Sequence, residues 1–150
     1  MTKAGSRVTL GGDTPFRRVG GTAGMETAKV LVVEDVPELS RLLEITFELD
    51  GRFIPVGTAT SGGQALDLAA RERPDAVVLD LSIDGIDGIG VLPSLRAVLP
   101  GARIIVFTGH DDPRLRAQAM DAGASAWVLK GGDLSSLLDE LGATLNDVTS

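Results

Sequence analysis

The chain has 150 residues, of which 43% are hydrophobic, with a formal net charge of -7 and no cysteine. This length and composition suit one compact domain, and the lack of thiols excludes disulfides, thiolate zinc sites and cysteine nucleophiles. The acidic balance argues against a nucleic-acid surface, and because no apolar run reaches membrane-spanning length and no signal-peptide pattern opens the chain, we expect a cytoplasmic protein without membrane contact.

The first segment of the chain is rich in glycine, carries scattered Lys and Arg, and has no sustained apolar periodicity. Such a composition is typical of segments that do not pack into a core. We therefore expect residues 1–26 to form a flexible leader and residues 27–150 to form the folded domain. The first 25 residues include four basic residues and one acid, which leaves 10 basic and 20 acidic residues in the remainder. The folded domain is thus strongly acidic.

Five short apolar runs have the length and composition of buried parallel strands. They cover residues 29–33, 53–59, 76–79, 103–108 and 126–129. Apolar residues at three- and four-residue steps follow each run and predict five helices. Pro55 interrupts the second run, and because proline lacks the N–H that a central strand needs, we expect this strand at an edge of the sheet.

Local signals mark where the predicted helices begin. Ser61 and Gln64 have capping-box spacing, Asp112 precedes a proline at a first helical position, and Asp133 should cap the last helix. Pro93 should bend the third helix early. Alternating strands and helices require a parallel sheet with right-handed crossovers and helices on both faces. We predict a flavodoxin-like, doubly wound (βα)5 domain of the α/β class, with a five-stranded sheet in the order 2-1-3-4-5.

Polar residues lie at the carboxyl ends of four of the five predicted strands. Because the carboxyl ends of parallel strands share one edge of the sheet, the side chains of these residues should converge there. They are Glu34, Asp35, Asp80, Thr108 and Lys130. Three clustered carboxylates repel one another and require a cation, and an all-oxygen site suits Mg²⁺. Lys130 and Thr108 would bind an incoming phosphoryl group, and Asp80 would be the nucleophile.

Four segments in this order and spacing carry a resemblance to a known family. They are Val-Val-Glu-Asp at 32–35, Asp-Leu-Ser-Ile-Asp-Gly-Ile-Asp-Gly at 80–88, Val-Phe-Thr-Gly at 106–109 and Ala-Gly-Ala-Ser-Ala-Trp-Val-Leu-Lys at 122–130. Over about residues 29–148 the chain resembles the receiver domain of response regulators, the two-component signalling proteins with a chemotaxis-regulator-like fold. Each segment alone is a weak signal, whereas the ordered set is a strong one.

The resemblance implies that Asp80 accepts a phosphoryl group from a histidine kinase or a phosphotransfer protein. Asp35 and the backbone carbonyl of Ser82 would join Asp80 in binding Mg²⁺, with Glu34 acting through bound water. A receiver of this kind catalyses only its own phosphoryl transfer and slow autodephosphorylation, so we expect no conventional enzyme activity.

The resemblance further implies that Lys130 pairs with the phosphoryl group, that Thr108 donates a hydrogen bond to it, and that Thr108 and Trp127 form the switch. Trp127 stands where the family usually has Tyr or Phe, so simple packing is an equal alternative for this residue. The surface of the fourth helix, fifth strand and fifth helix is expected to bind a downstream protein or a second copy of the chain. Only one helix's length follows Lys130, so we expect no output domain in this chain.

Two other functions stay open at this point. A phosphatase of the haloacid-dehalogenase kind also combines an Asp nucleophile, Thr, Lys and Mg²⁺, but it needs an Asp general acid two positions after the nucleophile, where this chain has Ser82. A receiver-like scaffold that works without phosphorylation is the third possibility. Gly131-Gly132 after the lysine and Ile83-Asp84 after Ser82 depart from the family pattern and would permit it.

Overall fold

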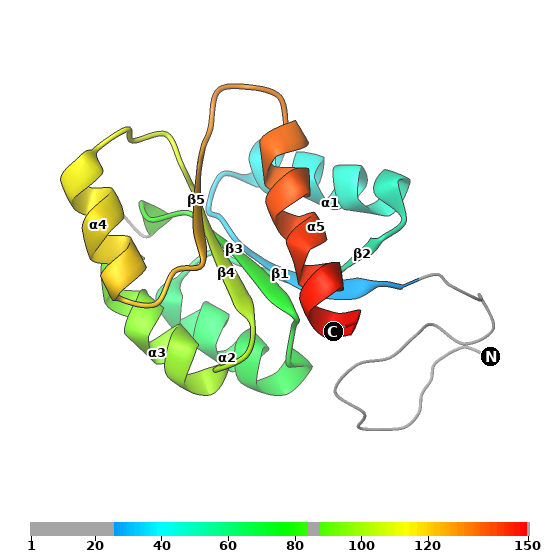
Figure 1. Cartoon of the computed structure of the whole chain (residues 1–150), viewed down its shortest axis with the longest axis horizontal. Coiled ribbons are helices and arrows are strands. Elements are labelled where there is room, and N and C mark those ends of the chain that lie inside the picture. Colours follow the sequence, from blue (N-terminus) through cyan, green and yellow to red (C-terminus); the bar gives the residue numbers. More distant parts are fainter. Residues whose placement is uncertain (1–25, 84–87, 150) are drawn as a thin grey trace.

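The computed structural model describes residues 26–83 and 88–149, which form alternating strands and helices (Figure 1). The strands are β1 (Ala28–Val33), β2 (Phe53–Ala59), β3 (Ala76–Leu79), β4 (Arg103–Thr108) and β5 (Ala126–Leu129), and the main helices are α1 (Pro37–Asp50), α2 (Gly62–Glu72), α3 (Leu92–Val98), α4 (Pro113–Asp121) and α5 (Ser135–Thr149). The leader expected at residues 1–26 and the extra carboxylate Asp84 lie outside the described residues, apart from Glu26.

The five strands form one parallel sheet in the order β2-β1-β3-β4-β5, which confirms the predicted topology. Among the described strands β2 lies at an edge and pairs with β1, as its proline predicted. The pairing register shifts between Val30 and Leu31, whose partners are Pro55 and Gly57, so Val56 is an extra residue in the edge strand. The shift follows the proline directly, where the strand cannot donate a backbone hydrogen bond.

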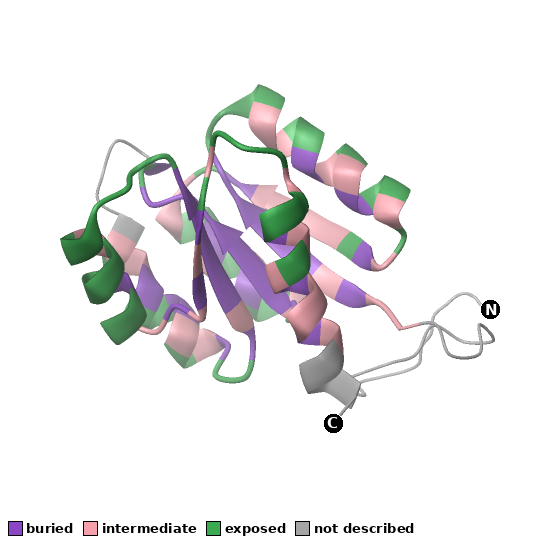
Figure 2. Ribbon diagram, turned by 45° about the horizontal axis from the view of Figure 1, so that its top comes forward, coloured by how far each residue is buried: buried purple, intermediate pink, exposed green. Residues whose placement is uncertain are grey.

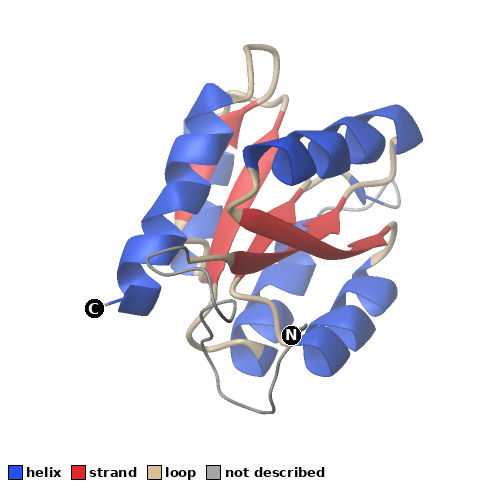
Figure 3. Cartoon of the chain, turned by 90° about the vertical axis from the view of Figure 1, so that its right-hand side faces the viewer, coloured by secondary structure: helices blue, strands red, loops and turns tan. Residues whose placement is uncertain are grey.

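Helices cover both faces of the sheet (Figure 3). Along β3, Val77 and Leu79 pack into one buried cluster with residues of α2, α3 and α4, whereas Ala76 and Val78 pack into a second cluster with residues of α1 and α5. This alternation is the two-residue period of a strand that is buried on both sides. The central strands are almost entirely buried (Figure 2). Their carboxyl ends are therefore held in fixed positions relative to one another.

The helix-start signals are confirmed at Asp112, which accepts hydrogen bonds from the N–H groups of Arg114 and Leu115, and at Asp133, which accepts from Ser135. Of the two hydrogen bonds that define the predicted capping box of α2, only one forms. Ser61 Oγ accepts from the Gln64 N–H at 3.2 Å, but the Gln64 side chain accepts from the backbone and hydroxyl of Thr60, not from the Ser61 N–H.

The expected bend at Pro93 is wrong in its detail. A 3₁₀ helix, η2 (Gly88–Val91), precedes α3, and Pro93 lies in the first turn of the α-helix that follows. Proline is tolerated in a first turn because the missing N–H has no partner there in any case. The segment is therefore divided into two short helices and not bent within one.

Arg96 on α3 ties together two loops at the amino edge of the sheet. Its guanidinium donates to the carbonyls of Leu99, Pro100 and Ala102 at 2.6 to 3.1 Å, and to the Gly123 carbonyl at 2.8 Å. Gly123 has φ +121°, and a Cβ built on it would lie 3.1 Å from Arg96 Cβ. This glycine is required both by its backbone conformation and by the close approach of Arg96.

We expect Gly123→Ala to lower the free energy of unfolding by about 1–2 kcal/mol, because alanine is strained at this φ and crowds Arg96. Gly63→Ala is the matched control, since Gly63 lies in the first turn of α2 with no heavy atom within 4 Å of its added Cβ. The control should be neutral or stabilising by up to about 1 kcal/mol. Urea unfolding of both variants measures the difference, and equal effects would contradict the role assigned to Gly123.

Within the described residues, none of the helices combines the length and the apolar character that crossing a bilayer requires.

Candidate functional site

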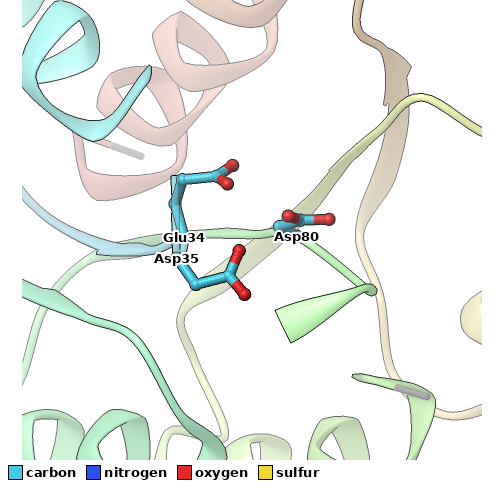
Figure 4. Close-up of side chains that lie close together, drawn as sticks. All are labelled: Glu34, Asp35 and Asp80. Carbon is cyan, nitrogen blue, oxygen red and sulfur yellow. The ribbon is translucent and has the colours of Figure 1, made fainter. Parts of the chain in front are cut away.

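Three carboxylates converge at the carboxyl edge of the sheet. Glu34 and Asp35 follow β1 directly, and Asp80 follows β3, its pairing partner. One oxygen from each side chain lies within 4.8 Å of the other two (Figure 4). Glu34 and Asp80 are buried, at 2% and 3% exposure, whereas Asp35 is exposed. The convergence predicted from the strand ends is confirmed, and it concentrates negative charge at a point that solvent reaches beside Asp35.

Lys130 follows β5 and reaches back across the sheet to this cluster. Its Nζ lies 3.0 Å from Glu34 Oε1 and 3.3 Å from Asp80 Oδ2. The backbone of Lys130 is fixed by a 2.7 Å hydrogen bond from its N–H to the Thr108 carbonyl. The sequence placed this lysine beside the acids. We expected the lysine to offset part of the repulsion among the acids, but its direct ion pair with Glu34 in particular could not be predicted from the sequence.

Ser82 bonds Asp80 with its side chain as well as its backbone. The N–H of Ser82 donates to Asp80 Oδ1 at 3.0 Å, and its hydroxyl donates to the same oxygen at 2.8 Å. The sequence analysis assigned Ser82 a role in metal binding through its backbone carbonyl and missed these bonds to Asp80. The signal was present, since an Asp followed two positions later by a donor commonly forms such a local turn. Both oxygens of Asp80 therefore have a donor, Oδ1 from Ser82 and Oδ2 from Lys130.

The surroundings shift the pKa values of the two buried acids in opposite directions. Burial raises the pKa of Glu34 above its ordinary value and the nearby charge of Asp80 adds to this, although Lys130 opposes both. Burial also acts to raise the pKa of Asp80, but the two hydrogen bonds from Ser82 and the charge of Lys130 outweigh it and hold that pKa below the ordinary value. Asp80 is thus kept ionised, as a nucleophilic carboxylate must be.

Thr108 and Trp127 occupy different surroundings. Thr108 is buried at the end of β4, and its Oγ1 accepts a hydrogen bond from the backbone N–H of His110 at 3.2 Å. Trp127 lies on β5 opposite Val106 and packs, partly buried, against the core cluster on the side of α2, α3 and α4. The structure thus places Trp127 in the packing environment that was its alternative interpretation, and the switch role stays a prediction.

The donor set fits a divalent cation. Carboxylate oxygens are hard ligands, and three of them within 4.8 Å provide the negative charge that a small hard cation requires. The exposure of Asp35 leaves a route for entry from solvent. Asp35 and Asp80 would supply side-chain oxygens, while Glu34 is already engaged by Lys130 at 3.0 Å.

Replacing Ser82 tests the hydroxyl that bonds Asp80. We expect Ser82→Ala to lose about 1 kcal/mol of stability at neutral pH without metal, because one hydrogen bond to a carboxylate disappears. The pKa of Asp80 is lowered, so the contribution of its ionised form is present above the ordinary pKa of an aspartate and is lost as the pH falls through the folded-state value. The difference should therefore fade in acid. Urea unfolding at neutral pH and in acid measures the difference between Ser82→Ala and the unmodified chain. Ser82→Thr, which keeps the hydroxyl, should retain most of the stability.

Comparison with protein families identifies the class of this domain. The model of the response regulator receiver domain matches residues 30–142. The chain belongs to that family and is a two-component signalling module, not a conventional enzyme. Family membership sets aside the haloacid-dehalogenase-like phosphatase. It also agrees with the parallel five-stranded topology and the acidic cluster.

Two curated relatives show how the match extends. The nitrate/nitrite response regulator protein homolog of Haemophilus influenzae is 34% identical over 113 residues, which cover 75% of this chain and 54% of that protein. Sporulation initiation phosphotransferase F of Bacillus subtilis is 31% identical over 115 residues, which cover 77% of this chain and 91% of that protein. The chain thus spans about half the length of the first relative and nearly all of the second.

Solved structures of similar fold include a two-component response regulator of the LuxR family from Aurantimonas sp. SI85-9A1, with a TM-score of 0.75, 31% identity, and coverage of 81% of this chain and 86% of that one. A response regulator protein from Burkholderia pseudomallei has a TM-score of 0.71 and 26% identity, with coverage of 81% and 70%. That structure contains a phosphorylated aspartic acid and a calcium ion.

Proposed function

We propose that this receiver domain takes a phosphoryl group onto Asp80 from the phosphohistidine of a histidine kinase or a phosphotransfer protein. The observation that carries the proposal is the position of Asp80, an ionised carboxylate held between two further acids and the ammonium group of Lys130. The phosphorylated aspartic acid in the structure from Burkholderia pseudomallei supports it by analogy.

In the transfer step a carboxylate oxygen of Asp80 bonds to phosphorus while the P–N bond of phosphohistidine breaks and its electron pair returns to the imidazole. Lys130, which now contacts Asp80 and Glu34, pairs with the arriving negative charge. The Thr108 hydroxyl donates a hydrogen bond to a phosphoryl oxygen. The chemistry follows the general rule for phosphoryl transfer, in which the protein mainly positions the reactants and neutralises charge.

We assign Mg²⁺ as the cofactor, with Asp35, Asp80 and the backbone carbonyl of Ser82 as ligands and Glu34 acting through bound water. Bound there, the ion would offset the charge on the oxygens of the reacting groups. The acidic donor set is the support for this assignment. A cytoplasmic location, where a kinase and its phosphodonor are available, belongs to the same proposal.

Incubation with a small phosphodonor and Mg²⁺, followed by intact mass measurement, tests the function. The mass should rise by one phosphoryl group, and a chelator should abolish the gain because the acids then repel the donor. A protein that gains no mass under conditions that phosphorylate another receiver would favour the phosphorylation-independent scaffold.

The signal would leave through the surface formed by α4, β5 and α5, where we place a downstream protein partner or a second copy of the chain. Thr108 and Trp127 connect the site to this face, and phosphorylation should shift the population of its conformations. We therefore expect phosphorylation to change the fluorescence of Trp127 and the hydrogen exchange of residues 112–148. If both stay unchanged in fully phosphorylated protein, the switch assigned to Trp127 is wrong.

A further inference from the structure

The outer side of α1 carries apolar side chains that the fold does not use. Leu42, Ile45 and Leu49 are 49%, 42% and 83% exposed. Their spacing of three and four residues places them on one side of the helix, which we call the α1 stripe. The opposite side of α1 is anchored in the core by Leu43 and Phe47 (Figure 2).

The α1 stripe is the main concentration of exposed apolar side chains in the described part of the chain. The remaining large hydrophobic residues exposed there by 40% or more do not form a second stripe, because apart from Val36, which precedes α1, they lie on three different elements. They are Val36, Ile54, Met120 and Leu129. Exposed apolar side chains that gather on one side of a helix are typical of contact sites, whereas single exposed residues are not.

We propose that the α1 stripe is covered by this chain's own residues 1–25. The segment joins the domain close to the end of α1, because the Ala28 N–H donates to the carbonyl of Arg52, just after that helix, at 2.9 Å. Arg52 lies three residues after Leu49, so the segment enters the domain beside the end of the stripe. From Leu49 to Leu42 the stripe extends about 10 Å along the helix. Twenty-five residues can span up to roughly 80 Å when extended, so the segment can follow the whole stripe.

The sequence of residues 1–25 complements this surface. The segment contains Phe16-Arg17-Arg18-Val19, in which two basic residues stand between apolar ones, and overall it has four basic residues and one acid. Helix α1 has the opposite balance, with Arg41 against four acids, Glu38, Glu44, Glu48 and Asp50. Glu44 and Asp50 already bond Thr58 and Arg52.

The other two acids of α1, Glu38 and Glu48, are exposed beside the stripe. Glu38 precedes Leu42 by one turn, and Glu48 lies three residues after Ile45, so both can receive Arg17 or Arg18 while Phe16 and Val19 contact the stripe. The basic segment and the acidic helix thus match in charge as well as in apolar content.

The full chain offers a direct test because it contains no cysteine, so Thr14→Cys gives one attachment point for a nitroxide label. We expect the label to broaden the backbone amide signals of residues 42–49 in the NMR spectrum and to leave those of α3 and α4 sharp. The pair Phe16→Ser and Val19→Ser, made in the labelled chain, should restore the signals of α1. High salt should restore them in part.

Two controls separate the outcomes. Leu42→Ser with Ile45→Ser changes only exposed side chains, so the domain stays folded, and it should also restore the signals. Mixing labelled protein without ¹⁵N with unlabelled ¹⁵N protein should give no broadening, and broadening in that mixture would assign the stripe to a second copy and overturn the proposal. Broadening confined to the residues around Ala28 and Arg52, or unaffected by either pair of substitutions, would also overturn it. The measurement involves no phosphorylation, so its failure is distinct from a failure of the proposed function.

Discussion

Asp80→Asn protein is expected to gain no mass when it is incubated with a small phosphodonor and Mg²⁺, whereas the unmodified chain gains one phosphoryl group. The amide of asparagine lacks the negative charge and the nucleophilic oxygen that attack phosphorus. It can still accept the two hydrogen bonds that Ser82 gives to Asp80 Oδ1, so the loop after β3 should keep its conformation. The loss should therefore be complete without a loss of the fold, and intact mass together with the thermal melting curve measures both.

The matched control for this substitution is Asp67→Asn, which removes one carboxylate from the exposed side of α2, away from the strand ends. It should be phosphorylated to the same extent as the unmodified chain. Undiminished phosphorylation of the Asp80→Asn protein would mean that another carboxylate is the acceptor, and the role assigned to Asp80 would be wrong.

The fold and the convergence of the acids were predictable because both depend on chain-wide regularities. Apolar runs alternating with helical periodicity require a parallel sheet, and a parallel sheet places Glu34, Asp80 and Lys130 at one edge whatever the side-chain details. Pro55 identified the edge strand by a local rule, because a proline lacks the N–H that pairing on both sides of a strand would need.

Other features depended on side-chain conformations that sequence patterns do not determine. The hydroxyl of Ser82 bonds Asp80, and the ammonium of Lys130 bonds Glu34, because particular rotamers bring these atoms to 2.8 and 3.0 Å. Gln64 had a choice between two neighbouring N–H groups and bonds that of Thr60. Pro93 could bend a helix or lie in the first turn of one. Because the 3₁₀ helix ends at Val91, Pro93 lies in the first turn of α3.

Lys130→Met is expected to give the largest loss of stability among the substitutions considered. Lys130 pairs with two carboxylates whose side chains are only 2% and 4% exposed. Without the lysine, Glu34 and Asp80 would face each other as buried charges with no cation. Removing one partner of a buried ion pair typically costs 3–5 kcal/mol, and because Lys130 itself is 23% exposed we expect about 3 kcal/mol. For a domain of this size that corresponds to a fall in melting temperature of roughly 10 °C.

The matched control is Arg71→Met, which breaks a surface ion pair with Glu72 at 3.5 Å, where the two side chains are 67% and 35% exposed. Such pairs are screened by water, so the control should change the melting temperature by little, in keeping with a contribution of about 0–1 kcal/mol. If the Lys130→Met protein and the control have the same melting temperature in the presence of a chelator, the lysine does not offset the repulsion between Glu34 and Asp80.

Mg²⁺ should also stabilise the folded protein by offsetting the negative charges of Glu34 and Asp80. At about one hundred times its dissociation constant, Mg²⁺ adds roughly 2.7 kcal/mol to any form that binds it only when folded. In the Lys130→Met protein the ion also supplies the positive charge that the lysine no longer provides, so its affinity should rise and the stabilisation at a fixed Mg²⁺ concentration should exceed that of the unmodified chain. Melting curves over a series of Mg²⁺ concentrations compare the two proteins. An equal or smaller shift for Lys130→Met would mean that the lysine and the metal do not share the charge of Glu34 and Asp80, and that the cation binds elsewhere.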